Sequence, residues 1–556
     1  MIPRPPFSRV LALLIVSVAL VLRAYALNFG LPLAEARPDE LTIAFQAMKF
    51  GTLDFNPHSF NYPSLFKYLT FGLFGFYYAI GRLFGIFEGQ EDFLRSFFTG
   101  AVTFRLWMRA LSAVAGTVGV ALLLWTPDPG ARRPGLGGLA AAMLLAGCFL
   151  HVRDSHFGVT DITMVSLATG SVLLAHRLQK LPSLKNALIA GLVAGLTTST
   201  KYNGALLCLP IALALIPPSG RPRTAELRLL MAAAAAMVGG FFAGSPYALL
   251  DFSAFWRDFS YETRHLVEGH RVDVGIGWVH HLTASLRYGM GIPLLLAGLG
   301  GVVVGFWKNR REAMVLYSFP IAYYLFIGRG ETAFFRYILP VVPFLCMAAG
   351  AWLAKTRGAL LWALAILSPS LLSTLLALRL MGAGDTRNEM GAWIEANVPT
   401  QARIVHAGTY SGAPMLQRNV ENQSREYAAK AGRADVAGFR KPDDPRWYDQ
   451  SRPAYDVLFI KKEGIDFASQ LSVAELTEQP PEWLMVEDYF LVHYSAVPTE
   501  VLQIVEEHYE LVHEERAWEG TVHPIFDQQD AFYLPVDGFS GFTRMGPGLK
   551  LYRRKS

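Results

Sequence analysis

The sequence predicts a polytopic α-helical membrane protein with about 11 transmembrane helices and one juxtamembrane helix, followed by an extracytoplasmic α/β domain. The chain has 556 residues, 52% of them hydrophobic, and a mean hydropathy of +0.29, which is typical of a membrane protein. Residues 385–556 hold 27 of the 45 acidic residues, so charge is concentrated near the end of the chain. We therefore expect a transmembrane domain over residues 1–384 and a soluble domain over residues 385–556.

Apolar segments define the expected spans. A helix needs about 20 apolar residues to cross a bilayer. Twelve segments approach this length, and several of them are shorter. They lie near residues 8–28, 66–87, 106–125, 136–152, 162–178, 186–199, 204–217, 228–250, 286–306, 313–328, 334–353 and 359–381.

Basic residues in the connecting loops fix the expected orientation, because cytoplasmic loops of membrane proteins are rich in Lys and Arg. If segment 8–28 leads outward, Arg132 and Arg133 are cytoplasmic only when one of the two segments between them and residue 28 does not cross. Segment 66–87 is the candidate, since it contains four Gly residues and no basic loop follows it. We expect it to lie along the outer membrane surface. Twelve spans would place the later clusters outside; these are Arg177, Lys180 and Lys185; Arg221, Arg223 and Arg228; Lys308, Arg310 and Arg311; and Lys355 and Arg357.

This orientation puts the N-terminus in the cytoplasm and the C-terminal domain outside. It also explains the net charge of +5 without a nucleic-acid partner, because the excess bases lie in short loops. The first segment resembles a signal peptide, but no convincing cleavage site follows it, so we expect a retained span. Cys148, Cys208 and Cys346 all lie in apolar segments, and cysteine usage leaves the compartment open.

Four polar stretches then share the external face. They are the loop 29–105 with Asp39 and Glu40, the turn from His151 to Asp161, the short loop 201–203, and residues 328–336. Ionisable residues close to a membrane are costly unless they face water or a charged ligand. The stretches are therefore candidate site segments.

Asp39 and Glu40 are the candidate catalytic residues. Acids in this position are also explained by a solvated loop or by the N-terminus of a helix, which favours negative charge. The functional alternative is a general base that deprotonates an acceptor for attack on an activated sugar. Asp39 is the first choice, because the preceding Pro38 restricts its backbone.

The other charged candidates have equally plain alternatives. Asp154 and Asp161 either pair with Arg153 and begin the next helix, or bind the acceptor or a sugar hydroxyl. Lys201 either extends its ammonium group to the membrane interface or holds a phosphate. Arg336 begins an apolar segment, and a guanidinium matches the geometry of phosphate.

The C-terminal residues predict alternating helices and strands. A helical pattern over 390–398 ends at Pro399. Strand-like runs follow at 403–407 and 455–460, then a helix at 500–508 and a last strand near 549–552.

Motifs for metal and nucleotide chemistry are missing from the sequence, which has no HExxH, CxxC or Walker A pattern. His280 with His281, and His508 with His513, lack convincing ligand spacing. We therefore assign no metal site and no certain cofactor, and a requirement for a divalent cation stays open. Asn422-Gln423-Ser424 matches a glycan-acceptor pattern, which is common by chance.

Four local patterns stand out along the chain. They are Arg37-Pro38-Asp39-Glu40, Asn61-Tyr62-Pro63-Ser64-Leu65, Thr200-Lys201-Tyr202, and Asp385-Thr386-Arg387 followed by Trp393-Ile394 and Asn397-Val398-Pro399. Together these patterns resemble the C superfamily of polyprenyl-phosphate-sugar-dependent membrane glycosyltransferases, in the branch of protein O-mannosyltransferases and bacterial lipid A aminoarabinose transferases. The resemblance covers most of residues 8–400.

The resemblance implies Asp39 as the catalytic acid, Asp161 as the acid of the second loop, and contacts of Lys201 and Arg336 with the donor phosphate. The chain departs from some members, which carry a Lys just before the pattern that opens the juxtamembrane helix. Here Asn61 and Tyr62 stand in that position, with His58 upstream and Lys67 downstream. We expect His58 and Tyr62 to contact acceptor or sugar, and Lys67 to be a further phosphate candidate.

The sequence therefore predicts a glycosyltransferase of the bacterial inner membrane that transfers a hexosyl or pentosyl group from a polyprenyl-phosphate donor. Membrane lipids and an external acceptor would be its other partners, and neither sugar nor acceptor can be named from the sequence. A transporter or flippase of a lipid-linked saccharide is the main alternative, although related halves and broken helices are not evident. A non-catalytic scaffold is the second.

Overall fold

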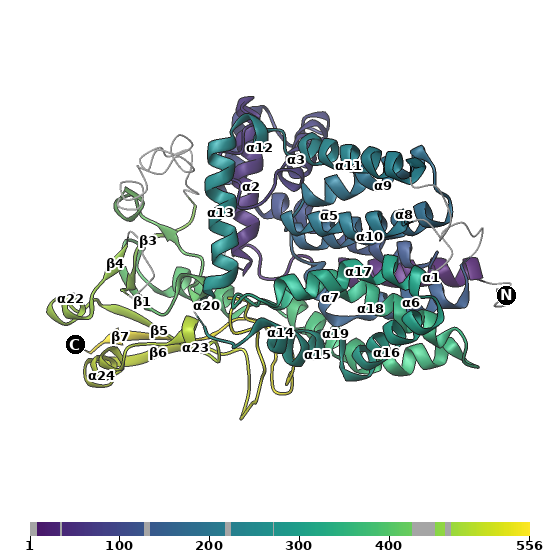
Figure 1. The fold of residues 1–556 in the computed structure, drawn as a ribbon. Coiled ribbons are helices and arrows are strands. Elements are labelled where there is room, and N and C mark those ends of the chain that lie inside the picture. Colours follow the sequence, from purple (N-terminus) through teal and green to yellow (C-terminus); the bar gives the residue numbers. More distant parts are fainter. Residues whose placement is uncertain are drawn as a thin grey trace. The chain divides into compact units, whose positions relative to one another are not determined.

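A computed structural model describes residues 8–33, 36–126, 134–216, 224–270, 272–424, 451–461 and 469–555 (Figure 1). The chain forms two compact units. The first comprises Met1–Leu27, Thr42–Gly75 and Arg105–Leu378, and the second comprises Asn28–Leu41, Phe76–Phe104 and Arg379–Ser556. Arg132, Arg133, Arg221 and Arg223, which entered the prediction of orientation, lie outside the described residues.

The first unit is built of helices, joined by short 3-10 and π-helical segments. Four helices belong partly to each unit, namely α2 (Pro38–Lys49), α3 (Leu65–Leu83), α5 (Val102–Leu123) and α19 (Ala359–Gly382). The remaining helices of the first unit are α1 (Ser8–Ala24), α6 (Leu136–Gly147), α7 (Phe149–Asp154), α8 (Thr160–Lys180), α9 (Leu184–Thr198), η3 (Tyr202–Leu207), α10 (Cys208–Ala214), α11 (Thr224–Gly244), α12 (Tyr247–Leu250), α13 (Phe252–Glu268), α14 (Gly277–His280), η4 (His281–Leu286), α15 (Arg287–Met290), α16 (Ile292–Lys308), α17 (Arg310–Ile327), η5 (Phe335–Val341) and α18 (Val342–Leu353).

Apolar helices of spanning length are present in the described residues. Four are long and apolar enough to cross a membrane, namely α5, α11, α19 and the continuous helix Phe335–Leu353. A fifth results if the pair Gly277–Met290 and Ile292–Lys308, bent by 114°, is one span. Leu136–Gly147, Leu184–Thr198 and Tyr202–Ala214 are shorter apolar helices. The protein is thus a mostly helical membrane protein, and the count of 11 spans stays a prediction.

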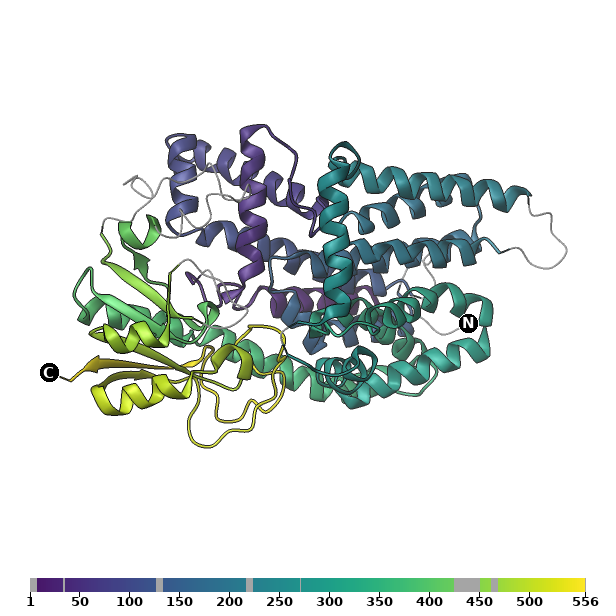
Figure 2. The same ribbon diagram turned by 60° about the vertical axis from the view of Figure 1, so that its left-hand side comes forward.

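Glycine residues bring α9 and α11 into close contact. A Cβ atom added at Gly191 would collide with the carbonyl oxygen of Ala233, and one at Gly195 with that of Met237. Small residues of this kind let helices approach closely within a membrane, where the hydrophobic effect does not drive them together. The two helices run side by side in both views, and α13 runs across their direction (Figures 1 and 2).

The second unit contains a mixed sheet in the order β2-β3-β1-β5-β7-β6, with β4 paired to β3. Strands β3, β1 and β5 are parallel, and β7 is antiparallel to both β5 and β6. The strands are β1 (Arg403–Ala407), β2 (Gln417–Arg418), β3 (Ala454–Ile460), β4 (Gln470–Leu471), β5 (Trp483–Asp488), β6 (Tyr509–Glu515) and β7 (Gly548–Arg554). The helices of this unit are α4 (Gln90–Thr99), α20 (Thr386–Asn397), α22 (Val473–Glu478), α23 (Val492–Ser495) and α24 (Thr499–His508), together with the short 3-10 turn η6 (Tyr410–Gly412). The 3-10 turn η2 (Phe50–Thr52) belongs to the first unit.

Alternating side chains of the parallel strands build two cores. Ile404 and Met485 pack with Met390 and Ile394 of α20 on one face. Residues of the opposite parity, such as Val405, pack with α22 and α24 on the other face. The predicted α/β character of the C-terminal residues is confirmed, and the helix over 390–398 and the strands at 403–407, 455–460 and 549–552 are found as α20, β1, β3 and β7.

A fully buried ion pair lies at the N-terminus of α20. Asp385 and Arg387 have no exposed side-chain surface, and two hydrogen bonds join them, Nε to Oδ1 at 2.8 Å and one terminal nitrogen to Oδ2 at 2.6 Å. The Asp385 carboxylate also accepts the backbone N–H of Arg387 at 3.0 Å. Charge buried this completely is tolerated only while both partners are present.

We predict that Asp385→Asn destabilises the second unit by about 3 kcal/mol, because it leaves the Arg387 guanidinium buried without its carboxylate. Thermal unfolding of the purified protein, followed by its intrinsic tryptophan fluorescence, measures the effect. Glu514→Gln is the matched control, since Glu514 pairs with Arg516 at an exposed site, where an ion pair contributes little. Equal melting temperatures for the two variants would contradict the prediction.

Candidate active site

Backbone hydrogen bonds fasten the predicted external loop within the first unit. The N–H of Ser64 donates to Ser245 Oγ at 2.9 Å, and the N–H of Leu65 donates to the carbonyl of Ser199 at 3.1 Å. The hydroxyls of Ser199 and Ser245 are themselves 2.7 Å apart. The start of α3 is thereby attached to the segment that leads directly to Lys201.

Lys67 lies buried in the first turn of α3. Its Nζ donates to the carbonyl of Ser59 at 2.7 Å. Burial lowers the pKa of Lys67 to about 7, and the negative charge of Asp258 opposes part of this shift. Asp258 also accepts the backbone N–H of Phe60 at 2.7 Å, so the same acid orients the loop. Lys67 is therefore a cation whose charge depends on pH near neutrality.

Lys201 and Asp161 are brought together from the two ends of one helical hairpin, formed by α8 and α9. Lys201 Nζ donates to Asp161 Oδ1 at 2.6 Å and lies 4.9 Å from the ring centroid of Tyr337. Burial disfavours the ammonium, but the Asp161 carboxylate outweighs it, and the pKa of Lys201 is raised. The neighbouring Tyr202 donates its hydroxyl to the carbonyl of Phe60 at 2.7 Å, which links this pair to the loop that holds Lys67.

Arg336 and Asp154 have contacts of their own in the first unit. Arg336 is buried next to Tyr337 in η5, with its guanidinium carbon 4.7 Å from the ring centroid of Phe334. Asp154, at the end of α7, forms a buried ion pair with Arg153 at 2.8 Å. Asp154 thus pairs with Arg153, and Asp161 pairs with Lys201.

His58 and Tyr62 lie in the loop before α3. His58 is exposed, and its Nε2 is 2.7 Å from Asp54 Oδ2. This contact lowers the pKa of Asp54, chiefly through the hydrogen bond. Asn56 ties the same loop to Asp251 through a 2.8 Å hydrogen bond, and Tyr62 is half-buried.

Asp39 and Glu40 occupy the first turn of α2, where negative charge favours the helix. They belong to the second unit, together with Arg37. Asp39 is half-buried and Glu40 is fully buried. Arg37 is held by Asp530, with one guanidinium nitrogen 2.8 Å from each carboxylate oxygen.

Two acids that the sequence did not single out hold these segments in place. Asp258 lies on the buried side of the amphipathic helix α13. The helical spacing of apolar residues over 252–266 is the sequence signal that could have indicated this helix. Asp530 lies in an irregular segment nearly 500 residues from Arg37, and nothing in the local sequence indicates the pair.

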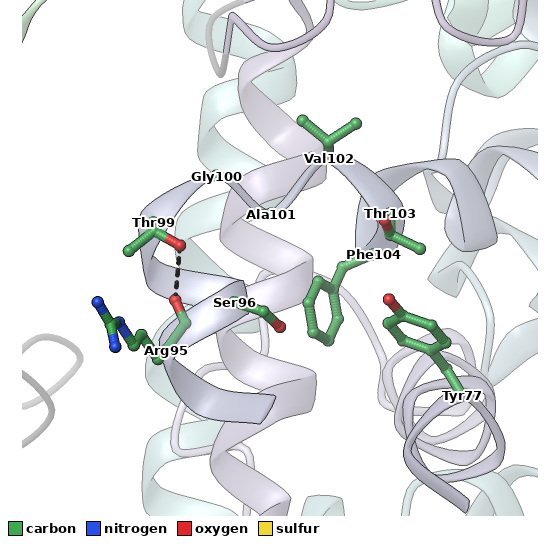
Figure 3. A pocket seen from close by; sticks show the side chains of 9 residues that line it. All are labelled: Tyr77, Arg95, Ser96, Thr99, Gly100, Ala101, Val102, Thr103 and Phe104. Atoms are coloured by element: carbon green, nitrogen blue, oxygen red, sulfur yellow. Dashed lines mark hydrogen bonds between the residues drawn. The ribbon is translucent and has the colours of Figure 1, made fainter. Parts of the chain in front are cut away.

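Among the described residues, no group of three or more His, Cys, Asp or Glu side chains is arranged to hold a metal ion. A cavity of about 320 Å³ lies at the turn between α4 and α5 (Figure 3). Tyr77, Arg95, Thr103 and Phe104 are among its lining residues, and none of the predicted site residues lines it.

The family described as dolichyl-phosphate-mannose-protein mannosyltransferase matches residues 105–246. The family resemblance is confirmed over these residues. They include Asp154, Asp161 and Lys201, whereas Asp39, Lys67 and Arg336 lie outside the matched stretch. The chain matches no curated protein.

Two solved proteins have a similar structure. ArnT from Cupriavidus metallidurans, bound to undecaprenyl phosphate, is 12% identical with 98% of each chain covered and a TM-score of 0.46. The same protein in its apo state is 11% identical with 97% of each chain covered and a TM-score of 0.48. The apo oligosaccharyltransferase of Archaeoglobus fulgidus is 15% identical, with 72% of this chain and 62% of that chain covered and a TM-score of 0.43. All three TM-scores are below 0.5.

We predict that Asp161→Asn and Lys201→Gln each destabilise the protein by about 3 kcal/mol, because each leaves one buried charge without its partner. The double variant should be less destabilised than the sum of the two single variants, since it leaves no unpaired charge. Thermal unfolding of the four proteins in one detergent measures this coupling. Additive effects would show that the two side chains do not interact.

Proposed function

We propose that the protein is a glycosyltransferase that takes a sugar from a polyprenyl-phosphate donor and delivers it to an acceptor on the outer face of the bacterial inner membrane. The observation that carries this proposal is the Lys201–Asp161 pair. It lies within the stretch that matches the mannosyltransferase family, and Tyr202, next to Lys201 in the chain, donates its hydroxyl to the Phe60 carbonyl in the loop before Lys67.

The expected arrangement follows the sequence prediction. About 11 transmembrane helices would form residues 1–384, α3 would lie along the outer membrane surface, and residues 385–556 would form the external domain. The N-terminus would be cytoplasmic. The apolar surface of α11, most of which is exposed in the isolated chain, suits contact with membrane lipids or with the long tail of the donor.

The reaction would be a single displacement with inversion. Asp39 would accept the proton of the acceptor hydroxyl while the acceptor oxygen attacks the anomeric carbon. The bond from that carbon to the phosphate oxygen breaks, and polyprenyl phosphate leaves with the electron pair. Lys201, Arg336 and Lys67 would stabilise the phosphate. Asp154, Asp161, His58 and Tyr62 would contact acceptor or sugar, and Glu40 would assist Asp39.

We predict that Asp39→Asn reduces sugar transfer by at least about 100-fold, because the amide cannot accept the proton. The measurement is transfer of radiolabelled sugar from a panel of polyprenyl-phosphate hexoses and pentoses to a membrane extract. The protein should stay folded, since the change is nearly isosteric and Asp39 is only half-buried.

Asp273→Asn is the matched control for this experiment. Asp273 is exposed, and its Oδ1 accepts the N–H of Gly275 at 2.7 Å, which an amide oxygen also does. Full activity of Asp39→Asn would overturn the assignment of Asp39. If no protein transfers label although wild type binds the donor, lipid movement across the bilayer is the next measurement. The bent pair Gly277–Met290 and Ile292–Lys308 is a feature that transporters also use.

We predict that donor binding weakens as pH rises above 7, because Lys67 then loses its charge. The sugar donor is a phosphodiester and keeps its single negative charge throughout, so only the protein titrates. The phosphate would raise the pKa of Lys67 in the complex, and affinity should fall by at most about sixfold between pH 7 and pH 8. Equilibrium binding of radiolabelled donor at pH 6, 7 and 8 tests this.

Lys67→Arg should remove this pH dependence, because Arg stays charged. Lys67→Gln should bind the donor weakly at every pH. The role of Lys67 is contradicted if wild type and Lys67→Arg respond equally to pH.

A further inference from the structure

The motif Asp385-Thr386-Arg387 has no part in the proposed chemistry, and neither does the external α/β domain that it begins. The sheet of this domain contains a position at which parallel sheets commonly bind ligands. The chain runs from β1 to β3 on one side and later to β5 on the other, so the strand order reverses between β1 and β5. Parallel sheets bind ligands outside the carboxyl ends of the strands at such a point.

In this domain, side chains of the protein itself occupy that position. Glu487, at the end of β5, is buried and accepts the Tyr533 hydroxyl at 2.8 Å and the Thr409 N–H at 3.1 Å. A Cβ atom added at Gly408 or Gly412 would collide with the Glu487 carboxylate, so the loop after β1 is closed around it. The crevice therefore holds protein segments.

Two chain segments are fixed by this arrangement. Arg387 donates to the carbonyl of Ser411 at 2.6 Å and lies over the ring of Tyr533, with its guanidinium carbon 4.8 Å from the centroid. Tyr533 is fully buried. Residues 385–388 and 530–533 thus have fixed positions relative to the sheet.

The same two segments contact the residues that precede Asp39. Asp530 binds Arg37, whose side chain is 1% exposed. Asn388 Nδ2 donates to the carbonyls of Gly30 and Leu31, at 3.2 Å each.

Aromatic contact and backbone shape complete this attachment. The rings of Phe29 and Phe532 meet edge to face, with centroids 5.7 Å apart. Gly30 has a φ of +61°, where a Cβ atom would also meet Ala36, so this tight turn requires glycine. The contacts with the α/β domain thus involve Phe29, Gly30, Leu31 and Arg37, shortly before α2.

We propose that the external α/β domain acts as a clamp that positions the catalytic acid. The clamp consists of Asn388, Asp530 and Phe532, and Asp530 is its central positioning residue. It holds Arg37, and Asp39 follows two residues later in the first turn of α2. This inference rests on the proposed function of Asp39, and it gives the domain a role other than ligand binding.

The test compares wild type with Asp530→Asn, Arg37→Gln and the double variant in the sugar-transfer assay with polyprenyl-phosphate donors. Each single variant should lower kcat by at least about tenfold and leave the KM for donor within about twofold. The double variant should lose no more than the worse single variant, because both changes break the same link. Glu389→Gln is the matched control, since Glu389 forms a part-exposed ion pair with Arg544 in the same domain.

Hydrogen exchange gives a readout that does not depend on activity. Amides of residues 36–41 should exchange faster in Asp530→Asn than in wild type or Glu389→Gln, while those of β1 and β5 stay unchanged. Unchanged exchange at 36–41 overturns the clamp. Faster exchange with unchanged kcat overturns the positioning role.

The outcomes also separate this inference from the proposed function. If Asp39→Asn is inactive but Asp530→Asn is fully active, the positioning role fails and the function stands. If Asp530→Asn lowers kcat, raises the KM for donor and loses protection in β1 and β5 together, the residue is merely structural. If wild type transfers no sugar from any donor, the proposed function fails and the positioning role fails with it.

Discussion

The ion pair between Lys201 and Asp161 is the interaction on which the polar region of the first unit depends. Both groups have lost most of their contact with water, so each requires the charge of the other. Because Asp161 begins α8 and Lys201 follows α9, the pair joins the two ends of a helical hairpin. Tyr337 of η5 covers the ammonium and adds a third segment.

The loop before α3 is attached to this region mainly through main-chain groups. The donors are the N–H groups of Ser64 and Leu65, and the Phe60 carbonyl accepts the Tyr202 hydroxyl. Main-chain hydrogen bonds place few demands on side-chain identity. The attachment of the loop therefore does not depend on which side chains stand at Asn61 and Tyr62.

Local patterns predicted much of the fold, and contacts between distant residues were beyond their reach. The helix ending before Pro399 was predicted from the helical spacing of its apolar residues, and the strands β1, β3 and β7 from short runs rich in apolar residues. Strand β5 was missed: its run Trp483–Val486 is buried on both faces like β3, but it has a single β-branched residue. Helix α13 was missed because its aromatic residues are mixed with charged ones.

The candidate site shows the same division. The sequence singled out Lys201 and Asp161 as separate charges, but their pairing joins residues that are 40 positions apart. It offered Arg153 as a partner for either acid, and Asp154 is the one that binds it. The pair of Arg37 and Asp530 spans almost the whole chain. Such pairs depend on how helices and strands pack, which local periodicity does not specify.

The two ion pairs Asp385–Arg387 and Asp161–Lys201 differ in how completely their side chains are buried. Asp385 and Arg387 have side chains that are 0% exposed, so no other group can approach them. Lys201 retains 15% exposure of its side chain and Asp161 8%. A phosphate oxygen can take the place of one carboxylate oxygen at Lys201 without leaving an ammonium uncompensated, because one negative charge replaces another. The Asp161 carboxylate would then be released to accept a hydrogen bond from a sugar hydroxyl. On the proposed function, this partly open pair would thus be stable without donor, and the donor phosphate would replace Asp161 as the partner of Lys201.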